Sequence, residues 1–390
     1  MTRALTAALA ALLFVSLLLA WVPERWAVSL LETGMFALAA AWVARWIARG
    51  GFLWSAPMIP LAAAVLWAAA QLATGATIYA RNTEDALLAW GTYLAAFTVA
   101  RNVFADPQRR DSFLRATLAF GFAVSIVATL SIFTSPEKVF WLFPAPSRNI
   151  VAGPFLSPNQ YAAFIELLLP VALAGAAAEG RRALPCAVMA GAMYASVVAC
   201  ASRAGFILTS AELVACLALA VHARSMSPRR MVRALGVVAL FAALFTTVVG
   251  WDVLLARLER ADPWVGRREM LASTIDMIRA RPWTGHGLGT WATAYPAFAY
   301  YDDGLFANTA HNDWAQWTAE GGIPFALLLI AMAAWAVRPA IRSRWGIGVL
   351  AVFLHCLVDY PLQKPALAAL VFVLLGALAS FMRSCPQNDS

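Results

Sequence analysis

The chain has 390 residues, of which 62% are hydrophobic and 13% charged, and its mean hydropathy is +0.70. These values exclude an ordinary water-soluble enzyme, because soluble domains are only about half apolar. The formal net charge of +8 would suit nucleic acid, but the basic residues lie in short clusters between apolar runs, where membrane topology signals lie. We therefore expect one membrane domain over residues 1–390 and no nucleic-acid partner.

About twelve apolar segments are long enough to cross a bilayer as helices, because a hydrocarbon core of about 30 Å needs roughly 20 helical residues. The first follows Arg3 and could pass for a signal peptide, but it ends in WVPER without a small-residue cleavage site. The sequence thus predicts an all-α integral membrane protein. The expected spans are residues 4–22, 27–47, 57–75, 84–104, 113–133, 160–178, 183–201, 204–222, 232–250, 322–338, 345–360 and 365–382.

Basic residues concentrate in alternate connections between these spans. With the N-terminus in the cytoplasm, RWIAR, GRR and HARSMSPRRMVR lie inside, as the positive-inside rule requires. Both termini are then cytoplasmic, and residues 134–159 and 251–321 are long external loops, which on a rigid scaffold are usually functional. Within the second loop, REMLASTIDMIRA predicts an amphipathic helix on the membrane surface. Its expected apolar face carries Met270, Leu271, Ile275 and Ile278.

Three arginines are candidates for binding an anion. Arg203 lies between two spans that are otherwise uncharged nearby, and it is either an interfacial arginine or a guanidinium that binds phosphate oxygens in pairs. Arg267 and Arg268 follow Gly266 and open the predicted surface helix, where the helix dipole disfavours cations unless an anion binds there. The alternative for this pair is solvated loop arginines.

Polar residues cluster around His311 just before an apolar span. Helical spacing would place Asn312, Gln316 and Glu320 on one face. A histidine at a membrane mouth serves as a general base or hydrogen-bond donor near neutral pH, whereas a lone loop histidine is merely solvated. We expect the functional role for His311.

Four further polar residues have less certain roles. Asn159 opens a span after a proline-rich turn, either as a helix cap or as an amide that faces substrate. His355 and Asp359 are predicted one helical turn apart on one face, where they would fix a helix or line a cavity. His286 in TGHGLG is expected in a tight turn. Because no nucleotide-binding loop or metal-binding spacing occurs in a suitable context, we expect no cofactor and no metal.

Five stretches in order resemble the O-antigen ligase and polymerase superfamily of bacterial membrane glycosyltransferases. They are GPFLSPNQYAAFIELLLP, ASRAG, VGRREML followed by RPWTGHGLGTW, AHNDWAQWTAEGGIP and HCLVDYPLQKPA, and they cover about residues 150–365. The resemblance implies a GT-C-like helical bundle in the inner membrane, whose periplasmic active site takes a glycan from undecaprenyl diphosphate without a metal. The implied acceptor is lipid A-core or a growing glycan.

Carried over by motif, Arg203 and Arg267 would be diphosphate-binding arginines and His311 the active-site histidine. Arg268, Asn159, Asn312 and Glu320 are the further substrate-binding candidates. Positioned cations would stabilise the charge that grows on the leaving diphosphate. The alternatives are a transporter or flippase for an anionic lipid or solute, and a non-catalytic scaffold for polysaccharide assembly.

Overall fold

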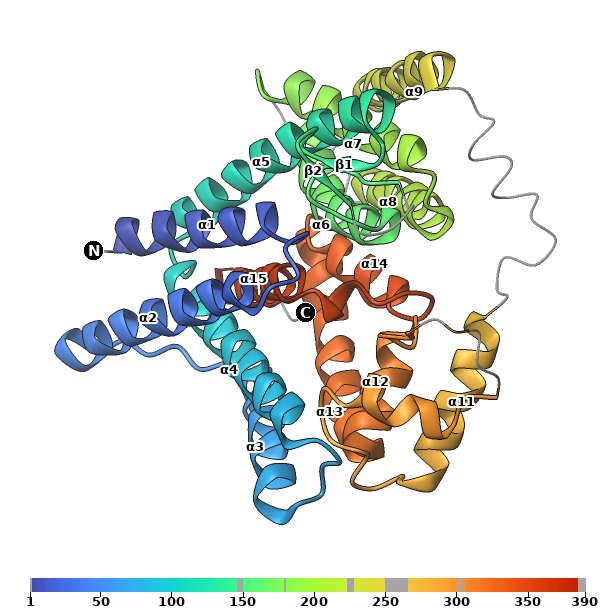
Figure 1. Cartoon of the computed structure of the whole chain (residues 1–390). Coiled ribbons are helices and arrows are strands. Elements are labelled where there is room, and N and C mark those ends of the chain that lie inside the picture. The colour runs from blue at the N-terminus through green and yellow to red at the C-terminus, as the bar shows by residue number, and fades with distance from the viewer. Residues whose placement is uncertain are drawn as a thin grey trace. The chain divides into compact units, whose positions relative to one another are not determined.

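The structure is a computed structural model, and helices dominate the residues that it describes, which are 2–145, 150–178, 180–222, 228–249, 266–300, 304 and 306–384 (Figure 1). Helices suit so apolar a chain because lipid offers the backbone no hydrogen-bond partners. The chain folds as two compact units, each made of three stretches of sequence. Unit 1 contains Met1–Ala27, Asp106–Pro263 and Arg338–His355, and unit 2 contains Val28–Ala105, Trp264–Val337 and Cys356–Ser390.

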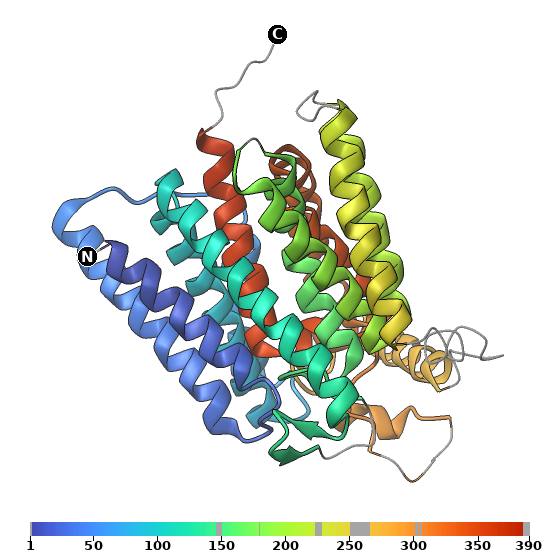
Figure 2. The same ribbon diagram turned by 90° about the horizontal axis from the view of Figure 1, so that it is seen from above.

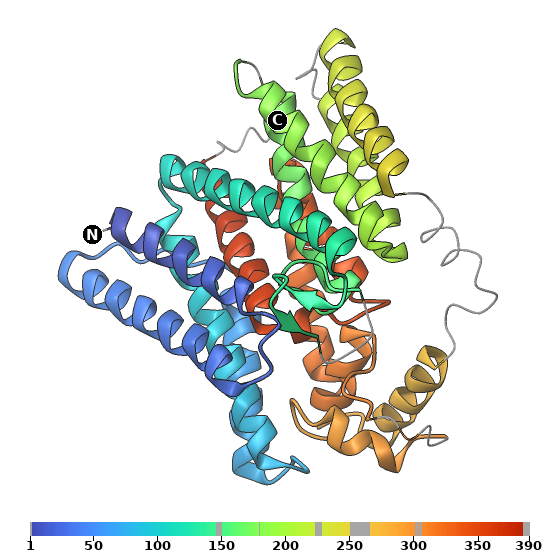
Figure 3. The ribbon, with the colours of Figure 1, turned by 45° about the horizontal axis from the view of Figure 1, so that its top comes forward.

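Unit 1 is built from apolar helices around a largely buried α6. α6 packs against α7, α8 and α14, while α7 also packs against α5 and α9. Figure 2 shows the yellow α9 beside the green helices, and Figure 3 shows the two short antiparallel strands that follow α5. The elements are α1 (Thr2–Leu18), α5 (Pro107–Thr134), β1 (Lys138–Val139), β2 (Phe143–Pro144), α6 (Pro158–Ala177), α7 (Ala183–Cys200), α8 (Arg203–His222), α9 (Pro228–Val249) and α14 (Ile347–His355).

Unit 2 combines long helices with the smaller elements of the predicted external loop. α4 packs against α3 and α15, and a separate apolar core joins α11, α12 and the start of α13 through Met277, Trp291 and Ala319 (Figure 1). α2 begins in unit 1, and α13 ends there. The elements are α2 (Arg25–Arg49), α3 (Met58–Thr74), α4 (Ala80–Val103), α11 (Arg267–Ala280), α12 (Trp291–Ala294), η1 (Tyr295–Ala297), α13 (Asp313–Ser343), η2 (Pro361–Gln363) and α15 (Pro365–Ser384).

The predicted apolar segments all contain helix, but they differ in length. Seven of the described helices, α2, α5, α6, α7, α8, α13 and α15, are long and apolar enough to cross a membrane, and α1 and α3 are shorter apolar helices. α14 has nine residues, fewer than the roughly 20 that a span needs. The helical membrane class is therefore supported, while the number of twelve crossings and the single membrane domain stay predictions.

α13 is two helices joined at Gly322, where the predicted span was expected to begin. Gly322 has φ 78° and ψ 175°, which breaks the helix, and the Ile323 N–H donates to the Pro282 carbonyl at 2.7 Å. A Cβ at Gly322 would lie 2.5 Å from the Trp283 carbonyl oxygen, so no larger residue fits without a shift. Residues 313–321 thus form a short helix of their own before the apolar stretch.

α11 confirms the helix predicted in the external loop. It ends at Ala280, and its buried residues are Ser273, Thr274 and Met277. Ile275, which was expected on the apolar face, is 39% exposed. The position of α11 on a membrane surface stays a prediction.

Candidate functional site

Arg267 opens α11 and binds a buried carboxylate of its own chain. Its Nη2 lies 3.0 Å from Asp359 Oδ2, and its Nη1 donates to the Val358 carbonyl at 2.9 Å. The Arg267 side chain is 27% exposed, whereas that of Asp359 is only 2% exposed. Gly266, at φ 78°, turns the chain into the helix. The cation at the helix start therefore has an anionic partner, and the guanidinium keeps an exposed part.

His311 lies on the other side of the same carboxylate. Its Nδ1 is 3.7 Å from Asp359 Oδ1, which is longer than a hydrogen bond. The backbone of His311 has φ 51°, a conformation uncommon outside glycine that recurs at functional sites. The ring of Tyr360 meets the His311 ring edge to face, with centroids 4.8 Å apart. Burial first and the charge of Asp359 second raise the pKa of Tyr360, so its hydroxyl stays neutral at neutral pH.

Asp313 ties the start of α13 to the segment that carries Asp359. Its backbone N–H lies 2.9 Å from the Cys356 carbonyl and 3.3 Å from that of Asp359. Its carboxylate accepts the Leu362 N–H at 3.0 Å and the Gln363 amide at 2.9 Å. Asp313 is fully buried. These four bonds set the positions of His311 and Asp359 relative to each other.

Asn312 and Arg268 flank these residues. The Asn312 side chain accepts the Ala315 N–H at 2.9 Å, which caps α13, and it donates to the Leu357 carbonyl at 2.8 Å. Arg268, beside Arg267, is exposed. Their roles in binding substrate stay predictions.

Glu320 holds the glycine-rich turn GHGLG. Its two oxygens accept the N–H groups of Gly289 at 3.0 Å and Trp291 at 3.1 Å. Gln316 lies on the same face, as the helical spacing predicted, and donates to Glu320 at 3.2 Å while it accepts the Ala310 N–H at 3.0 Å. Both carboxylate oxygens of Glu320 are thus engaged by the chain itself. Binding of substrate by Glu320 stays a prediction.

Gln71 of α3 binds the same turn, and the sequence analysis missed it. Its amide donates to the carbonyls of Thr284 at 2.8 Å and Glu320 at 3.0 Å, and its oxygen accepts the Leu288 N–H at 2.9 Å. A single amide inside an otherwise apolar helix was the available signal, since such a group needs partners in lipid.

His286 confirms the tight turn. It lies between Gly285 and Gly287, which have φ 66° and φ 109°. Its Nε2 is 3.0 Å from the Met277 carbonyl oxygen, and its ring is buried. Burial lowers the pKa of His286, so the neutral ring donates this bond.

Asn159 and Arg203 lie at the same end of unit 1. The prediction that Asn159 caps a helix is wrong, because Ser157 is the N-cap of α6 and accepts the Asn159 N–H at 3.3 Å. The Asn159 side-chain oxygen instead accepts the Ser202 hydroxyl at 2.7 Å, and Ser202 also accepts the Gly205 N–H at 3.1 Å. Arg203, at the first position of α8, is partly buried. This network joins the two motifs that carry Asn159 and Arg203.

The predicted pairing of His355 with Asp359 is also wrong. α14 ends at His355, so the four-residue spacing does not continue as a helix. His355 belongs to unit 1 and lies 2.8 Å from Glu166, while Asp359 belongs to unit 2 and binds Arg267. Within unit 2, Arg267 and His311 thus lie beside the carboxylate of Asp359, which the sequence analysis had paired with His355.

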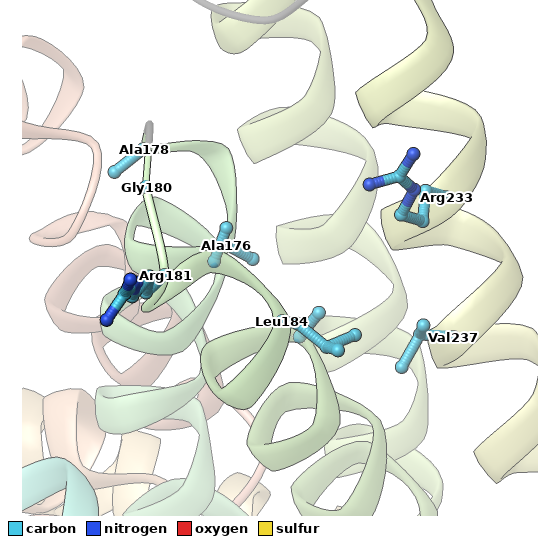
Figure 4. Close-up of a pocket in the computed structure, with 9 residues that line it drawn as sticks. Ala176, Ala178, Gly180, Arg181, Leu184, Arg233 and Val237 are labelled. Atoms are coloured by element: carbon cyan, nitrogen blue, oxygen red, sulfur yellow. The ribbon is translucent and has the colours of Figure 1, made fainter.

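Two cavities in unit 1 are lined by none of the predicted site residues. One, of about 310 Å³, is lined by residues of α6, α7, α9 and the connection between α6 and α7, and these include Arg181 and Arg233 (Figure 4). The other, of about 700 Å³, lies between α1 and α5. Within the described part of the chain, no group of three or more His, Cys, Asp and Glu residues is arranged to hold a metal ion. Metal independence stays a prediction.

The apolar helices indicate a multi-pass membrane protein, and Arg203, Arg267 and His311 lie at or next to helix starts. The family model described as O-antigen ligase matches residues 187–331, a range that contains Arg203, Arg267, His311 and Glu320. This match confirms the resemblance to the O-antigen ligase and polymerase superfamily. The match supports glycan transfer of the ligase or polymerase type in the synthesis of surface polysaccharide. No curated protein matches the chain.

Proposed function

We propose that this chain transfers a glycan from an undecaprenyl-diphosphate-linked donor to lipid A-core or to a growing glycan, at the periplasmic face of the bacterial inner membrane. The O-antigen ligase match over residues 187–331 supports transfer of this general kind. The observation that carries the proposal is the Asp359 carboxylate, whose two oxygens face Arg267 and His311. Arg267, which would bind the diphosphate, and His311, which would deprotonate the acceptor hydroxyl, thus lie beside the same buried carboxylate.

Arg267 is the anion-binding residue of this proposal. Its guanidinium has five N–H donors, of which two bond to Asp359 and Val358 among the described residues, and its exposed part can reach phosphate oxygens. A unit charge pair at about 4 Å is worth about 4 kcal/mol at an effective dielectric near 20. Asp359 offsets part of the positive charge of Arg267. We therefore propose that Arg203 and Arg268 also bind the diphosphate.

The transfer exchanges one bond to the sugar for another. The bond from the anomeric carbon to the phosphate oxygen breaks, and its electron pair leaves with the diphosphate. The acceptor hydroxyl oxygen bonds to the anomeric carbon, and its proton passes to His311. Positioned arginines stabilise the charge that develops on the leaving group more than the charge of the bound donor, which lowers the barrier.

Asp359 is the positioning residue for His311. A carboxylate that accepts a hydrogen bond from Nδ1–H fixes the ring orientation and leaves Nε2 as the base. Nδ1 and Oδ1 lie 3.7 Å apart, and catalytic hydrogen bonds often tighten only when substrate binds. General-base catalysis of this kind typically contributes about 10²- to 10⁴-fold.

The test is complementation of a strain that lacks the chromosomal copy. We expect R203A, R267A and H311A to insert at wild-type levels and to lose long surface glycan. Arg279 provides a matched control, because it also lies on α11, is 75% exposed and pairs with Asp276. R279A should complement fully. If R203A, R267A and H311A supported normal surface glycan, the transferase proposal would be refuted in favour of a scaffold.

The material that accumulates identifies the reaction. Loss of glycan on lipid A-core with a build-up of lipid-linked polymer indicates a ligase, whereas capping by single repeats indicates a polymerase. Purified protein in liposomes that moved an anionic lipid across the bilayer without changing it would instead favour a transporter.

A further inference from the structure

Three ionisable side chains lie together in the interior of unit 1. Glu166 belongs to α6, Glu212 to α8 and His355 to the last position of α14. Their exposed fractions are 0%, 2% and 0%. α6, α8 and α14 pack against one another, so the three side chains share one apolar interior.

Both glutamates lie near the middle of their helices. Glu166 is eight residues beyond the start of α6, and Glu212 is nine residues beyond the start of α8. At 1.5 Å per residue these positions are about 12 Å and about 14 Å from the helix starts. Each helix has 20 residues and is apolar enough to cross a membrane, and a crossing by either helix would place its carboxyl group near the bilayer centre.

Among the described residues, the cluster contains one ion pair. His355 Nδ1 lies 2.8 Å from Glu166 Oε1. Among the described residues, neither oxygen of Glu212 and not the second oxygen of Glu166 has a hydrogen-bond partner. Glu166 and Glu212 lie on α6 and α8, which pack against each other. Cys216, one turn further along α8, is buried as well.

A charged Glu212 would be costly in this setting. An unpaired buried carboxylate loses its hydration without compensation, and such groups bind a proton instead. The nearby Glu166 adds repulsion between like charges. The cluster has no net charge when Glu212 is protonated and the Glu166–His355 pair consists of a carboxylate and a protonated imidazole.

We propose that Glu166, Glu212 and His355 form a proton-binding site in the interior of unit 1, with Glu212 as the carboxyl group that stays protonated at neutral pH. This site is separate from the proposed glycan transfer and uses none of its residues. The ligand is a proton and not a metal cation, because only three carboxylate oxygens are without partners and no metal-type group occurs among the described residues.

A protonated carboxyl in lipid has a characteristic reaction with hydrophobic carbodiimides. Its O–H adds across one C=N bond, so that the carboxyl oxygen bonds to the central carbon and the proton goes to nitrogen. The acyl group then shifts from oxygen to nitrogen to give a stable N-acylurea, and no other reactant is needed. A carboxylate without its proton does not begin this reaction.

The test is labelling of the full-length protein in membranes with dicyclohexylcarbodiimide, followed by peptide mass mapping. We expect an adduct on Glu212 at neutral pH that decreases at alkaline pH, while a water-soluble carbodiimide does not label this residue. E212Q should remove the adduct, and E137Q, which changes an exposed glutamate of unit 1, should leave it. Adducts at other glutamates with Glu212 unlabelled would overturn the proposal.

Stability gives a second readout that does not depend on reagent access. In this proposal the folded wild type holds a proton on Glu212 that the unfolded chain releases. The equilibrium constant for folding of wild type therefore falls, relative to that of E212Q, by up to about tenfold for each unit by which the pH rises. Between about pH 6 and about pH 8 the thermal midpoint of wild type should therefore fall more than that of E212Q. Because glutamine matches a protonated glutamate in size and charge and does not ionise in the unfolded chain, E212Q should be at least as stable as wild type near about pH 6. Equal pH slopes would refute the proton site, as would a large loss of stability in E212Q at that pH.

Discussion

Substitution of Asp359 tests the centre of the proposed site most directly. In D359N the side chain keeps its size, but Arg267 loses a charged partner at 3.0 Å and His311 loses the carboxylate at 3.7 Å. The Coulomb attraction of the Arg267 pair is about 5.5 kcal/mol at an effective dielectric of 20, before desolvation is subtracted. Hydrogen bonds to charged groups contribute about 1.5–3 kcal/mol net. Because the Val358 carbonyl still binds Arg267 in the variant, we expect D359N to destabilise the protein by about 2 kcal/mol.

A double-mutant cycle separates the ion pair from general damage. We expect R267A and D359N to be less costly together than the sum of their single effects, with a coupling of about 1.5–3 kcal/mol. The assay is unfolding of the purified protein in detergent, alongside surface glycan in the complemented strain. D359N should lower glycan transfer by about 10²-fold or more, because both Arg267 and His311 lose their positioning group. Wild-type transfer in D359N, or a coupling near zero, would refute the role of this carboxylate.

Three further predictions concern the glycine-rich turn. A Cβ at Gly287, where φ is 109°, would lie 2.2 Å from the Thr77 hydroxyl oxygen. G287A should therefore lower the free energy of unfolding by at least about 2 kcal/mol. The control G236A, where an added Cβ meets open space, should leave it unchanged or raise it slightly. E320A removes the acceptor of two backbone N–H groups of the turn, and we expect faster proteolysis there with a loss of about 2–4 kcal/mol; an unchanged digestion pattern would contradict this role. Burial lowers the pKa of His286, so the unfolded chain binds more protons and stability falls as pH drops below the usual histidine pKa of about 6.5. The thermal midpoint of H286Q should therefore depend less on acid pH than that of wild type. An equal pH dependence in the two proteins would exclude His286 as the source of the acid sensitivity.

The sequence by itself determined the membrane class and the positions of most helices, because apolar runs in lipid have few alternatives to helix. It also placed a helix start at Arg267, the start of an apolar span at residue 322 and the turn at His286, since glycines and helix periodicity are local signals. These are features that a short stretch of chain specifies without the rest of the fold.

The tertiary structure decided which polar groups meet. The spacing of His355 and Asp359 suggested one helical face, but the helix ends at His355, and the two side chains take partners far away in sequence, Glu166 and Arg267. Gln71 binds a turn more than two hundred residues away. Most buried polar groups have a hydrogen-bond partner, but which partner each one finds depends on the packing of distant helices, and local sequence does not specify that packing.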